Sequence, residues 1–509
     1  MLKDIYGEIK ARKNVKDNLI KLKAEIKNPN ENRVFRYMLA GDYEILAELM
    51  KHEDPKVRKN AALILGELED DICVSMLFDA YAGENTLFVK PAYLKAMYKL
   101  DCRAYVDEFK TVRDELTSGK FQEDELKHVR EQISLLNRLI SKYEKNQKHT
   151  FQGYDEKYDI VLTTNRKQVK VLADMLSHYD IRLLKAGVRL CVDDIRSILG
   201  IRIYNEILFP LSMEKTDCGR DNNGDDGAES DFSKPYDAAY GILNGNLKEI
   251  LQKAHKDNSP YRFRVELRGI ADRDEETAFA RKFASELERL SASFLVNDTS
   301  DYELEIRLVK NKTGEYIPFL KLMTLKDERF SYRKNVLPVS MHPMNAALMV
   351  KLAEKYLSPD ARVLDPFCGV GTCLIERRYL MEAATLYGTD TFGKAIDMAR
   401  ENARAAGIIV NYINRDYFDF THEHRFDEII TDMPVVTGKH TYEEIVRIYS
   451  RFFQKSSELL NSAGVIVMYS NEKKLVLENV KNQKEFEMAE EFVVSKKDER
   501  YIFVIKKLK

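Results

Sequence analysis

Apolar residues in the first third of the chain recur three or four positions apart, the spacing of helices with one buried face. Residues 46–50 show this spacing, and Asp54-Pro55 then opens a second helix, because proline is favoured in the first turn. The expected inner face of that helix comprises Val57, Ala61, Ala62, Leu65 and Leu68. Its two small alanines allow a neighbouring helix to approach closely. With further helices predicted over 74–146, residues 1–148 are expected to form a helical array.

Residues 54–66 read D-P-x-V-R-x-x-A-A-x-x-L-G, a pattern that resembles HEAT-like repeats. The resemblance covers about 40–116 and implies an α-solenoid, since such helix pairs bury their apolar faces only against their neighbours. The array is expected either to dock a protein or RNA partner or to be a structural appendage. Residues 1–37 hold ten Lys/Arg against five Asp/Glu, so this end of the array is basic.

Between residues 149 and 335, strand patterns alternate with helical ones. The predicted strands are 158–164, 261–269, 302–309 and 315–323, with a helix over 275–291. This α+β pattern resembles the THUMP domain and the ferredoxin-like subdomain that precedes it in RNA-modifying enzymes. The resemblance implies that this domain holds RNA, and a tRNA is expected. Residues 214–231 carry seven acidic residues against two basic ones, and we interpret them as a solvated loop that repels RNA.

From residue 336 to residue 509, strand and helix patterns alternate strictly. Strands followed by helices predict a parallel, doubly wound, Rossmann-like sheet. The last two strand patterns, 486–495 and 500–508, are separated only by the short polar turn KKDE. They are therefore expected to form an antiparallel pair that closes the sheet. The chain is thus predicted to contain three domains, 1–148, 149–335 and 336–509.

The string D-P-F-C-G-V-G-T spans residues 365–372, where the first strand of this last domain ends and a helix begins. Doubly wound sheets bind ligands beyond the carboxyl ends of their strands, and glycines there admit backbone conformations closed to other residues. The string resembles motif I of class I S-adenosylmethionine (SAM) methyltransferases, in the branch that carries THUMP domains and methylates guanine N2 in RNA. The resemblance implies SAM binding by Asp365, Phe367, Gly369, Gly371 and Thr372. A P-loop is excluded because no Gly-Lys-Ser/Thr follows. The string also lacks the third glycine of a dinucleotide-binding fingerprint, so a nicotinamide cofactor is not expected.

Three more acidic residues end predicted strands of this domain. Asp390 lies 25 residues after Asp365, where a carboxylate can accept hydrogen bonds from both hydroxyls of a ribose. The resemblance implies that Asp416 bonds the adenine amino group and that Asp365 orients the loop and meets the methionine amino group. Asp432 is expected to border the cofactor as well as the acceptor.

At the end of the fourth strand this family carries Asp/Asn-Pro-Pro-Tyr/Phe, and here the sequence is Asp432-Met433-Pro434-Val435. The resemblance implies that Asp432 and Pro434 are catalytic, with a carboxylate and a backbone carbonyl accepting hydrogen bonds from the exocyclic amine. Met433 keeps the carbonyl, whereas Val435 removes the ring that stacks on the base, a contact worth about 1–3 kcal/mol. Either another ring replaces it, or the acceptor differs, or activity is lost. The candidate rings are Phe330, Phe367 and Tyr442.

Four other side chains near these motifs are expected to be mainly structural or solvated. Cys368 lies in the cofactor loop, unlike the Pro-Cys nucleophile of cytosine C5 methyltransferases, so we do not interpret it as a nucleophile. His342, just before a predicted helix, is more often structural in such a place than functional. Lys439 and His440 either contact phosphate or are solvated.

Composition limits the remaining possibilities. The chain holds 81 Lys+Arg against 83 Asp+Glu, which excludes indiscriminate phosphate binding and leaves room for an enzyme that reads RNA shape. The local basic excess includes Arg329, Arg333 and Lys334, in the joint before the last domain. Six cysteines without CxxC spacing predict no metal site. No stretch has the roughly 18 apolar residues of a membrane span, and the chain starts without an apolar signal core, so a cytoplasmic protein is expected.

The sequence thus favours a SAM-dependent methyltransferase acting on guanine N2, most simply in tRNA. Other amine acceptors, in rRNA, at adenine N6 or in a protein, remain open, because the Asp-Pro-Pro-Tyr type of motif is shared among amine methyltransferases. A degenerate methyltransferase fold serving as a scaffold for the helical array is the non-enzymatic alternative.

Overall fold

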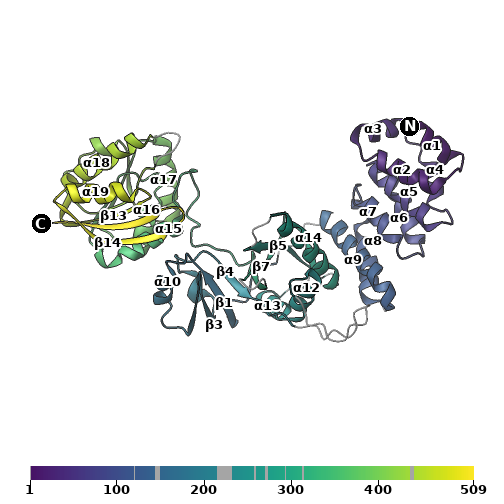
Figure 1. Cartoon of the computed structure of the whole chain (residues 1–509), viewed down its shortest axis with the longest axis horizontal. Helices are drawn as coiled ribbons and strands as arrows, with labels where there is room; N and C mark the ends of the chain where they lie inside the picture. Colours follow the sequence, from purple (N-terminus) through teal and green to yellow (C-terminus); the bar gives the residue numbers. More distant parts are fainter. Residues whose placement is uncertain are drawn as a thin grey trace. The chain divides into compact units, whose positions relative to one another are not determined.

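The computed structural model of the chain forms two compact units, each built from two separate segments (Figure 1). The first unit comprises Met1–Gln152 and Leu211–Thr324, and the second comprises Gly153–Pro210 and Leu325–Lys509. The predicted three-domain boundaries follow a different division, and they stay a prediction. The structure describes residues 2–119, 121–143, 149–214, 232–256, 260–269, 273–292, 294–311, 315–435 and 441–508. Most of the acidic segment (215–231), as well as Lys439 and His440, lies outside these ranges.

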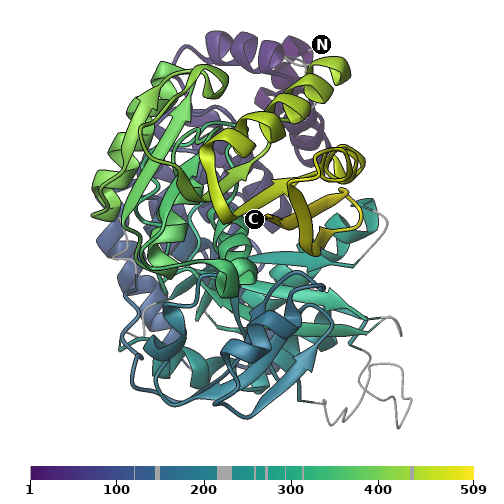
Figure 2. The same cartoon turned by 90° about the vertical axis from the view of Figure 1, so that its left-hand side faces the viewer.

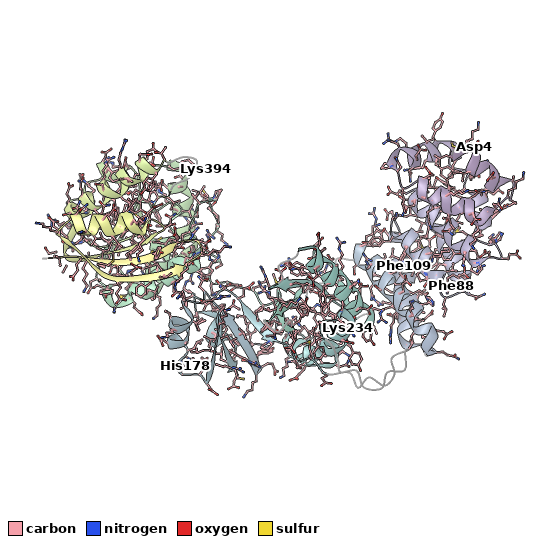
Figure 3. The ribbon with its side chains drawn as sticks, viewed as in Figure 1. Asp4, Phe88, Phe109, His178, Lys234 and Lys394 are labelled. Carbon is pink, nitrogen blue, oxygen red and sulfur yellow. The ribbon has the colours of Figure 1, made fainter. Side chains whose placement is uncertain are left out.

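The first unit begins with helices that pack around a shared apolar core. They are α1 (Leu2–Lys10), α2 (Val15–Glu25), α3 (Pro29–Leu39), α4 (Glu44–Leu49), α5 (Pro55–Glu67), α6 (Cys73–Gly83), α7 (Lys90–Met97), α8 (Val106–Ser118) and α9 (Glu123–Tyr143). Asp54 caps α5 by accepting a hydrogen bond from the Lys56 amide at 2.8 Å. The whole predicted inner face of α5 is buried, and Phe109 of α8 lies in the same core (Figure 3).

A close contact between helices occurs at a glycine one turn beyond the alanine pair. A Cβ added to Gly66 of α5 would lie 2.5 Å from the Ala96 Cα of α7. The sequence therefore predicted that small residues admit a neighbouring helix, while the packing placed the contact one turn further along. The resemblance to HEAT-like repeats stays a prediction.

The same unit continues with helices α12 (Pro235–Asn244) and α13 (Leu247–Ala254) and a four-stranded sheet. The strands are β5 (Tyr261–Arg268), β6 (Leu295–Asn297), β7 (Leu304–Lys310) and β8 (Tyr316–Leu322), in the order β8-β7-β5-β6. β5 runs parallel to β6 and β7, whereas β8 is antiparallel to β7. Helix α14 (Arg273–Leu290) follows β5 and packs beside α12 (Figure 1).

The second unit starts with an antiparallel sheet in the order β2-β3-β1-β4. Its elements are β1 (Tyr158–Thr163), α10 (Val169–Met175), β2 (Ile181–Leu184), β3 (Gly187–Val192), α11 (Arg196–Leu199) and β4 (Ile207–Pro210). The first of the predicted strands, 158–164, is thus confirmed as β1.

The rest of the second unit is a seven-stranded sheet in the order β11-β10-β9-β12-β13-β15-β14. The strands are β9 (Arg362–Asp365), β10 (Thr385–Asp390), β11 (Asn411–Asn414), β12 (Phe426–Asp432), β13 (Leu460–Ser470), β14 (Phe486–Ser495) and β15 (Arg500–Lys507). The first five are parallel, and β15 pairs antiparallel with both β13 and β14. The predicted doubly wound sheet with a closing hairpin is confirmed.

Helices cover both faces of this sheet (Figures 1 and 2). α18 (Tyr442–Leu459) and α19 (Lys473–Asn482) pack on one face, where Ile429, Ile466 and Phe503 join Phe452 and Val476 in a buried cluster. α15 (Pro343–Ala353), α16 (Thr372–Leu380) and α17 (Gly393–Ala406) also contact strands of the sheet. Because side chains alternate along a strand, Ile430 and Asp432 face away from the cluster. Within the described ranges, no helix combines the length and apolar character needed to cross a membrane.

Candidate active site

The glycine loop between β9 and α16 is shaped by two left-handed residues. Gly369 has φ +50° and Gly371 has φ +84°, and the Gly371 amide bonds the Cys368 carbonyl at 2.8 Å. A Cβ on Gly369 would meet no atom within 4 Å, so this side of the loop is open. A Cβ on Gly371 would lie 2.1 Å from Tyr412 Oη. One glycine therefore leaves room beside the loop, and the other makes room for a neighbouring ring.

Asp365 supports this loop from beneath. Its side chain is 1% exposed and accepts a hydrogen bond from the Phe367 amide at 3.2 Å. Burial raises the pKa of Asp365 to about 8, and the nearby carboxylates Asp432 and Asp390 add to the rise. The carboxyl group is therefore largely protonated at neutral pH in the protein alone. A positively charged amino group beside it would favour the ionised form, which suits the expected contact with the methionine part of SAM.

Asp390, at the end of β10, joins two loops at the same edge of the sheet. One carboxylate oxygen accepts the Gly369 amide at 3.0 Å, and the other accepts the Phe392 amide at 2.8 Å. The Asp390 side chain stays half-exposed, and each of its oxygens has a further lone pair for a hydroxyl donor. Its predicted ribose contact fits this geometry and stays a prediction.

Asp416 and Thr372 flank the same edge. Asp416 follows β11 and accepts the Phe418 amide at 2.9 Å, which caps a short 3₁₀ helix, Tyr417–Asp419. Thr372 is the first residue of α16 and is buried, and its Oγ1 has no hydrogen-bond partner among the described residues. An unpartnered buried hydroxyl is uncommon in proteins, and a polar ligand in the glycine loop would supply a partner.

Asp432 occupies the end of β12, beside β9 in the sheet. The Met433 amide bonds the Tyr469 carbonyl at 3.0 Å, so strand pairing continues one residue beyond Asp432. Burial raises the pKa of Asp432 to about 7, and Arg500 opposes the rise. Within the described part of the chain, no hydrogen bond to the Asp432 carboxylate forms, while Pro434 and Val435 are half-exposed. The group implied to be catalytic is thus available to an external donor.

The three rings considered as replacements for the aromatic missing at 435 have different surroundings. Phe367 packs against Tyr417 and Phe452, with ring centroids 5.8 and 6.2 Å away. Phe330 lies against the guanidinium of Arg202 at 4.8 Å. Tyr442, the first residue of α18, is 51% exposed. Tyr442 is therefore the ring of the three that is most accessible to a base.

Other predicted side chains have structural roles. His342 caps α15 by accepting the Met344 amide at 3.3 Å, in agreement with its structural interpretation. Cys368 is buried, and burial raises the pKa of its thiol, which opposes a nucleophilic role. Arg329, expected in a basic joint, is instead 8% exposed and bonds the Tyr204 carbonyl at 2.8 Å, because it holds the segment before β4. In the described ranges no group of His, Cys, Asp or Glu is suited to hold a metal ion.

Sequence reasoning missed the residues that connect the cofactor loop to the rest of its unit. Glu376, one turn into α16, is 1% exposed and pairs with both Nε (2.6 Å) and Nη2 (2.8 Å) of Arg202. Tyr332 donates to the same carboxylate at 2.7 Å. Asn402 of α17 is fully buried and bonds the carbonyls of Asn335 and Val370 at 3.0 and 3.1 Å. The sequence signal for this pair was Glu376, a charged residue on the apolar face of a predicted helix. It does not indicate the partner, because Arg202 is 174 residues away in the chain.

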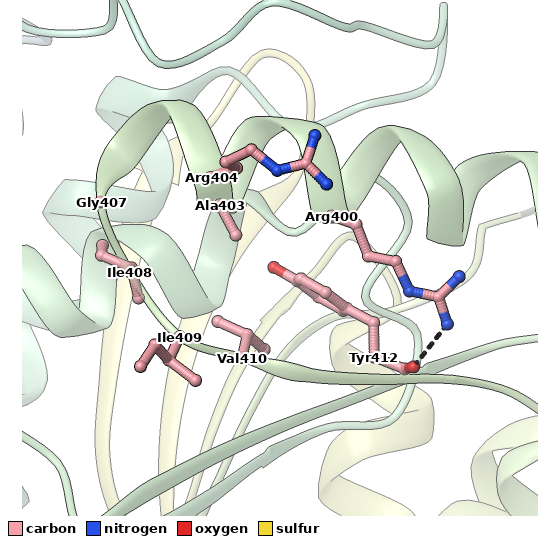
Figure 4. A pocket seen from close by; sticks show the side chains of 8 residues that line it. All are labelled: Arg400, Ala403, Arg404, Gly407, Ile408, Ile409, Val410 and Tyr412. Atoms are coloured by element: carbon pink, nitrogen blue, oxygen red, sulfur yellow. Dashed lines mark hydrogen bonds between the residues drawn. The ribbon is translucent and has the colours of Figure 1, made fainter.

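A separate cavity of about 350 Å³ lies between the end of α17 and β11, and Tyr412, whose ring packs on Gly371, forms part of its wall (Figure 4). Arg400 closes one side of it and donates to the Tyr412 carbonyl at 3.0 Å. The lining residues are Arg400, Ala403, Arg404, Gly407, Ile408, Ile409, Val410 and Tyr412. None of the predicted site residues lines this cavity.

Comparison with known proteins identifies the last part of the chain. Residues 331–502 match the protein family described as "RMKL-like, methyltransferase domain". The chain is 28% identical over 194 residues to the tRNA (guanine(10)-N2)-dimethyltransferase of Methanothermobacter thermautotrophicus, covering 36% of this chain and 56% of that protein. It is 29% identical to the tRNA (guanine(6)-N2)-methyltransferase of Thermus thermophilus, covering 27% and 41% of the two chains.

Another relative is the carboxy-S-adenosyl-L-methionine synthase of Nautilia profundicola, at 25% identity over 29% of this chain and 58% of that one. The chain thus spans about half the length of the curated relatives it matches. The crystal structure of TrmN from Thermus thermophilus superposes with a TM-score of 0.51 at 21% identity, over 69% of this chain and 99% of that one. These likenesses confirm a methyltransferase domain with the class I fold and SAM as its cofactor.

Proposed function

We propose that the chain is a SAM-dependent RNA methyltransferase that acts on the exocyclic N2 of a guanine, in tRNA. The observation that carries the proposal is the shared edge of the sheet. β9 ends in the glycine loop, and the adjacent strand β12 ends in Asp432. The two strand ends are close enough that the charge of Asp432 raises the pKa of Asp365. An acceptor amine beside Asp432 is thereby next to the cofactor loop, as methyl transfer requires.

In this proposal each residue at the edge has one task. Phe367, Gly369, Gly371 and Thr372 form the loop that holds the cofactor, with Asp365, Asp390, Asp416 and Asp432 around it. SAM, when bound, supplies the methyl group. Asp432 accepts a hydrogen bond from the acceptor amine and so directs its lone pair, and the backbone carbonyl of Met433, joined to Pro434, accepts a second. A negative carboxylate also stabilises the positive charge that develops on nitrogen.

The RNA part of the proposal is supported by the tRNA (guanine-N2) methyltransferase activities of two relatives and by the sequence pattern of 149–335. That region would grip the RNA, and the target base would have to leave its stack to reach Asp432. The HEAT-like region 1–148 would add a docking surface for RNA or a protein. Methylation of another amine is the second candidate, because the Nautilia relative shows that likeness in this domain does not define the substrate.

Nucleoside mass spectrometry tests the proposal directly. Total tRNA from a strain lacking the protein should lose one N2-methylguanosine, and purified protein with SAM should restore it. Loss of an rRNA or adenine modification instead would reassign the acceptor. Absence of a thermal shift at millimolar SAM would support the scaffold alternative, since a bound ligand raises the unfolding midpoint.

A further inference from the structure

One face of the sheet gathers polar side chains around Asp432 that the sequence motifs do not include. The pairing register sets Asp432 opposite Tyr469 of β13, and Tyr469 opposite Ile502 of β15. Side chains alternate along strands, so Arg500, two residues before Ile502, projects from the same face. Asp432, Tyr469 and Arg500 therefore lie on one face, at the edge where the cofactor loop also lies.

The hydroxyl of Tyr469 has an unusual environment. The side chain is 4% exposed, and its Oη meets no described residue in normal hydrogen-bond geometry, although the Arg500 side chain lies near enough to interact with it. A buried polar group without a partner costs about 1–3 kcal/mol, so most such groups in proteins find one. Asn471 Oδ1, two residues further along, is also buried and unpartnered within the described ranges. Two buried polar atoms at the end of β13, the strand beside that of Asp432, thus lack a hydrogen bond of normal geometry within the described ranges.

Arg500 is the one positive group among those that act on Asp432. The described groups that interact electrostatically with its carboxylate come from five elements: Asp365 of β9, Cys373 of α16, Tyr449 of α18, Tyr469 of β13 and Arg500 of β15. Burial raises the pKa of Asp432, and the charge of Arg500 lowers it. Arg500 also acts on Tyr469, whose pKa burial raises and Arg500 lowers. Arg500 is exposed, and the negative charge of Asp498 in the same hairpin also acts on it.

We propose that Arg500 is a positioning residue of this enzyme, whose charge favours the ionised form of the Asp432 carboxylate across strand β13, where Tyr469 lies between the two groups. An ionised carboxylate accepts the hydrogen bond of an amine, whereas a protonated one presents an O–H towards it. The hairpin β14–β15 thereby contributes to catalysis without touching the acceptor. This inference rests on the proposed role of Asp432 and specifies what keeps that group active.

The first test is the pH dependence of kcat/KM for full-length protein with SAM and total tRNA from the strain that lacks it. Removing one charge near a carboxylate shifts its titration by about one unit. Arg500→Gln should therefore lose about fivefold at pH 7 and regain nearly full activity at pH 9, and Arg500→Lys should stay within about twofold of wild type. Tyr469→Phe should shift the acid limb in the same direction by less. A loss that is equal at all pH values, or no loss, would overturn the proposal.

Two variants serve as controls. Lys473→Gln removes another positive charge of this region. The Lys473 ammonium lies 5.2 Å from the ring of Tyr501, the residue that follows Arg500, and its loss should leave the acid limb in place. Tyr449→Phe removes a hydroxyl that bonds Ser470 at 2.7 Å on the opposite face of the sheet. It should lower the unfolding midpoint without moving the acid limb, whereas Tyr469→Phe should leave the midpoint unchanged or higher. An acid limb that moves equally in the Lys473 variant would mean that overall charge, not Arg500, is responsible.

A second measurement does not depend on activity. A carboxyl whose pKa is raised on folding disfavours the folded state as pH rises above its unfolded pKa of about 3.9. Asp432→Asn should thus raise the unfolding midpoint more at pH 8 than at pH 5, and this gain should increase in an Arg500→Gln background. If tRNA is not methylated but this coupling is present, the proposed acceptor is wrong and the role of Arg500 stands. Without the coupling, the role of Arg500 is refuted.

Discussion

Substitution of Gly371 by alanine gives the sharpest test of how the cofactor loop is built. The new Cβ would lie 2.1 Å from Tyr412 Oη and 2.9 Å from its Cζ, and the backbone φ of +84° disfavours any side chain. The tyrosine ring also packs closely on Gly388, because a Cβ added there would lie 2.8 Å from the ring. The Tyr412 ring therefore packs closely against both glycines.

The expected cost combines backbone strain with overpacking. Left-handed φ costs a non-glycine residue about 1–2 kcal/mol, and added atoms in a packed core cost about 1–3 kcal/mol. We expect Gly371→Ala to destabilise its unit by about 2–5 kcal/mol, or about 5–15 °C in the unfolding transition that SAM shifts. Gly369→Ala is the matched control: its Cβ meets no atom, so it should lower that midpoint by only about 2–5 °C and mainly weaken SAM binding.

A second substitution separates crowding from strain. Tyr412 Oη is buried without a partner in the described structure, so Tyr412→Phe should be neutral or stabilising by itself. Combined with Gly371→Ala it should recover about 0.5–3 kcal/mol, measured as a double-mutant cycle of unfolding midpoints and calorimetric SAM affinities. If Gly371→Ala lowers the unfolding midpoint no more than Gly369→Ala does, or if Tyr412→Phe recovers no stability, the Tyr412 ring does not constrain the loop.

Three further outcomes follow from the same geometry. Asp432→Asn should bind SAM within about twofold of wild type by calorimetry yet lose at least about 100-fold in transfer of tritiated methyl to tRNA; an equal loss of both would contradict a role confined to the acceptor. Arg202→Met leaves Glu376 buried without its positive partner and with only the Tyr332 hydroxyl bonded to it, which should cost about 3–5 kcal/mol in denaturant unfolding. Adding Glu376→Gln should return much of that loss; additive losses would refute a direct pair. Burial raises the pKa of Asp365 to about 8, so the folded state binds its proton more tightly than the unfolded chain does. The unfolding midpoint should therefore fall as pH rises from about 4 towards 8, and Asp365→Asn should flatten this decline; an unchanged slope would refute the assignment.

The predicted elements that follow from local patterns are present in the structure. Alternating strand and helix patterns indicated the parallel sheet and its closing hairpin, because each element carries its own periodicity and its own turn signals. The D-P-F-C-G-V-G-T string identified the cofactor loop because it is also a local signal. Its two glycines adopt left-handed conformations in the turn between the strand and the helix. The buried face of α5 and its Asp54 cap are local in the same sense.

Features that depend on distant partners did not follow from the sequence. The sequence placed Arg329 in a basic joint, and only its hydrogen bonds with the segment at Tyr204 show that it is buried. Nothing near Glu376 indicates that Arg202 pairs with it, or that 153–210 and 325–509 form one compact unit. The hairpin strand β15 inserts next to β13, and this insertion brings Arg500 to the face of Asp432.

The sequence by itself determined the elements, the cofactor motif and the acidic residues that end the strands, because these are set by spacing within about twenty residues. Only the tertiary structure decided which of those acids are buried, which charges oppose their protonation, and which ring near the missing aromatic at 435 is exposed. The physical reason is that desolvation and Coulomb interactions depend on distance in space. Asp432 and Arg500 lie on one sheet face, two strands apart, although 67 positions of the chain lie between them.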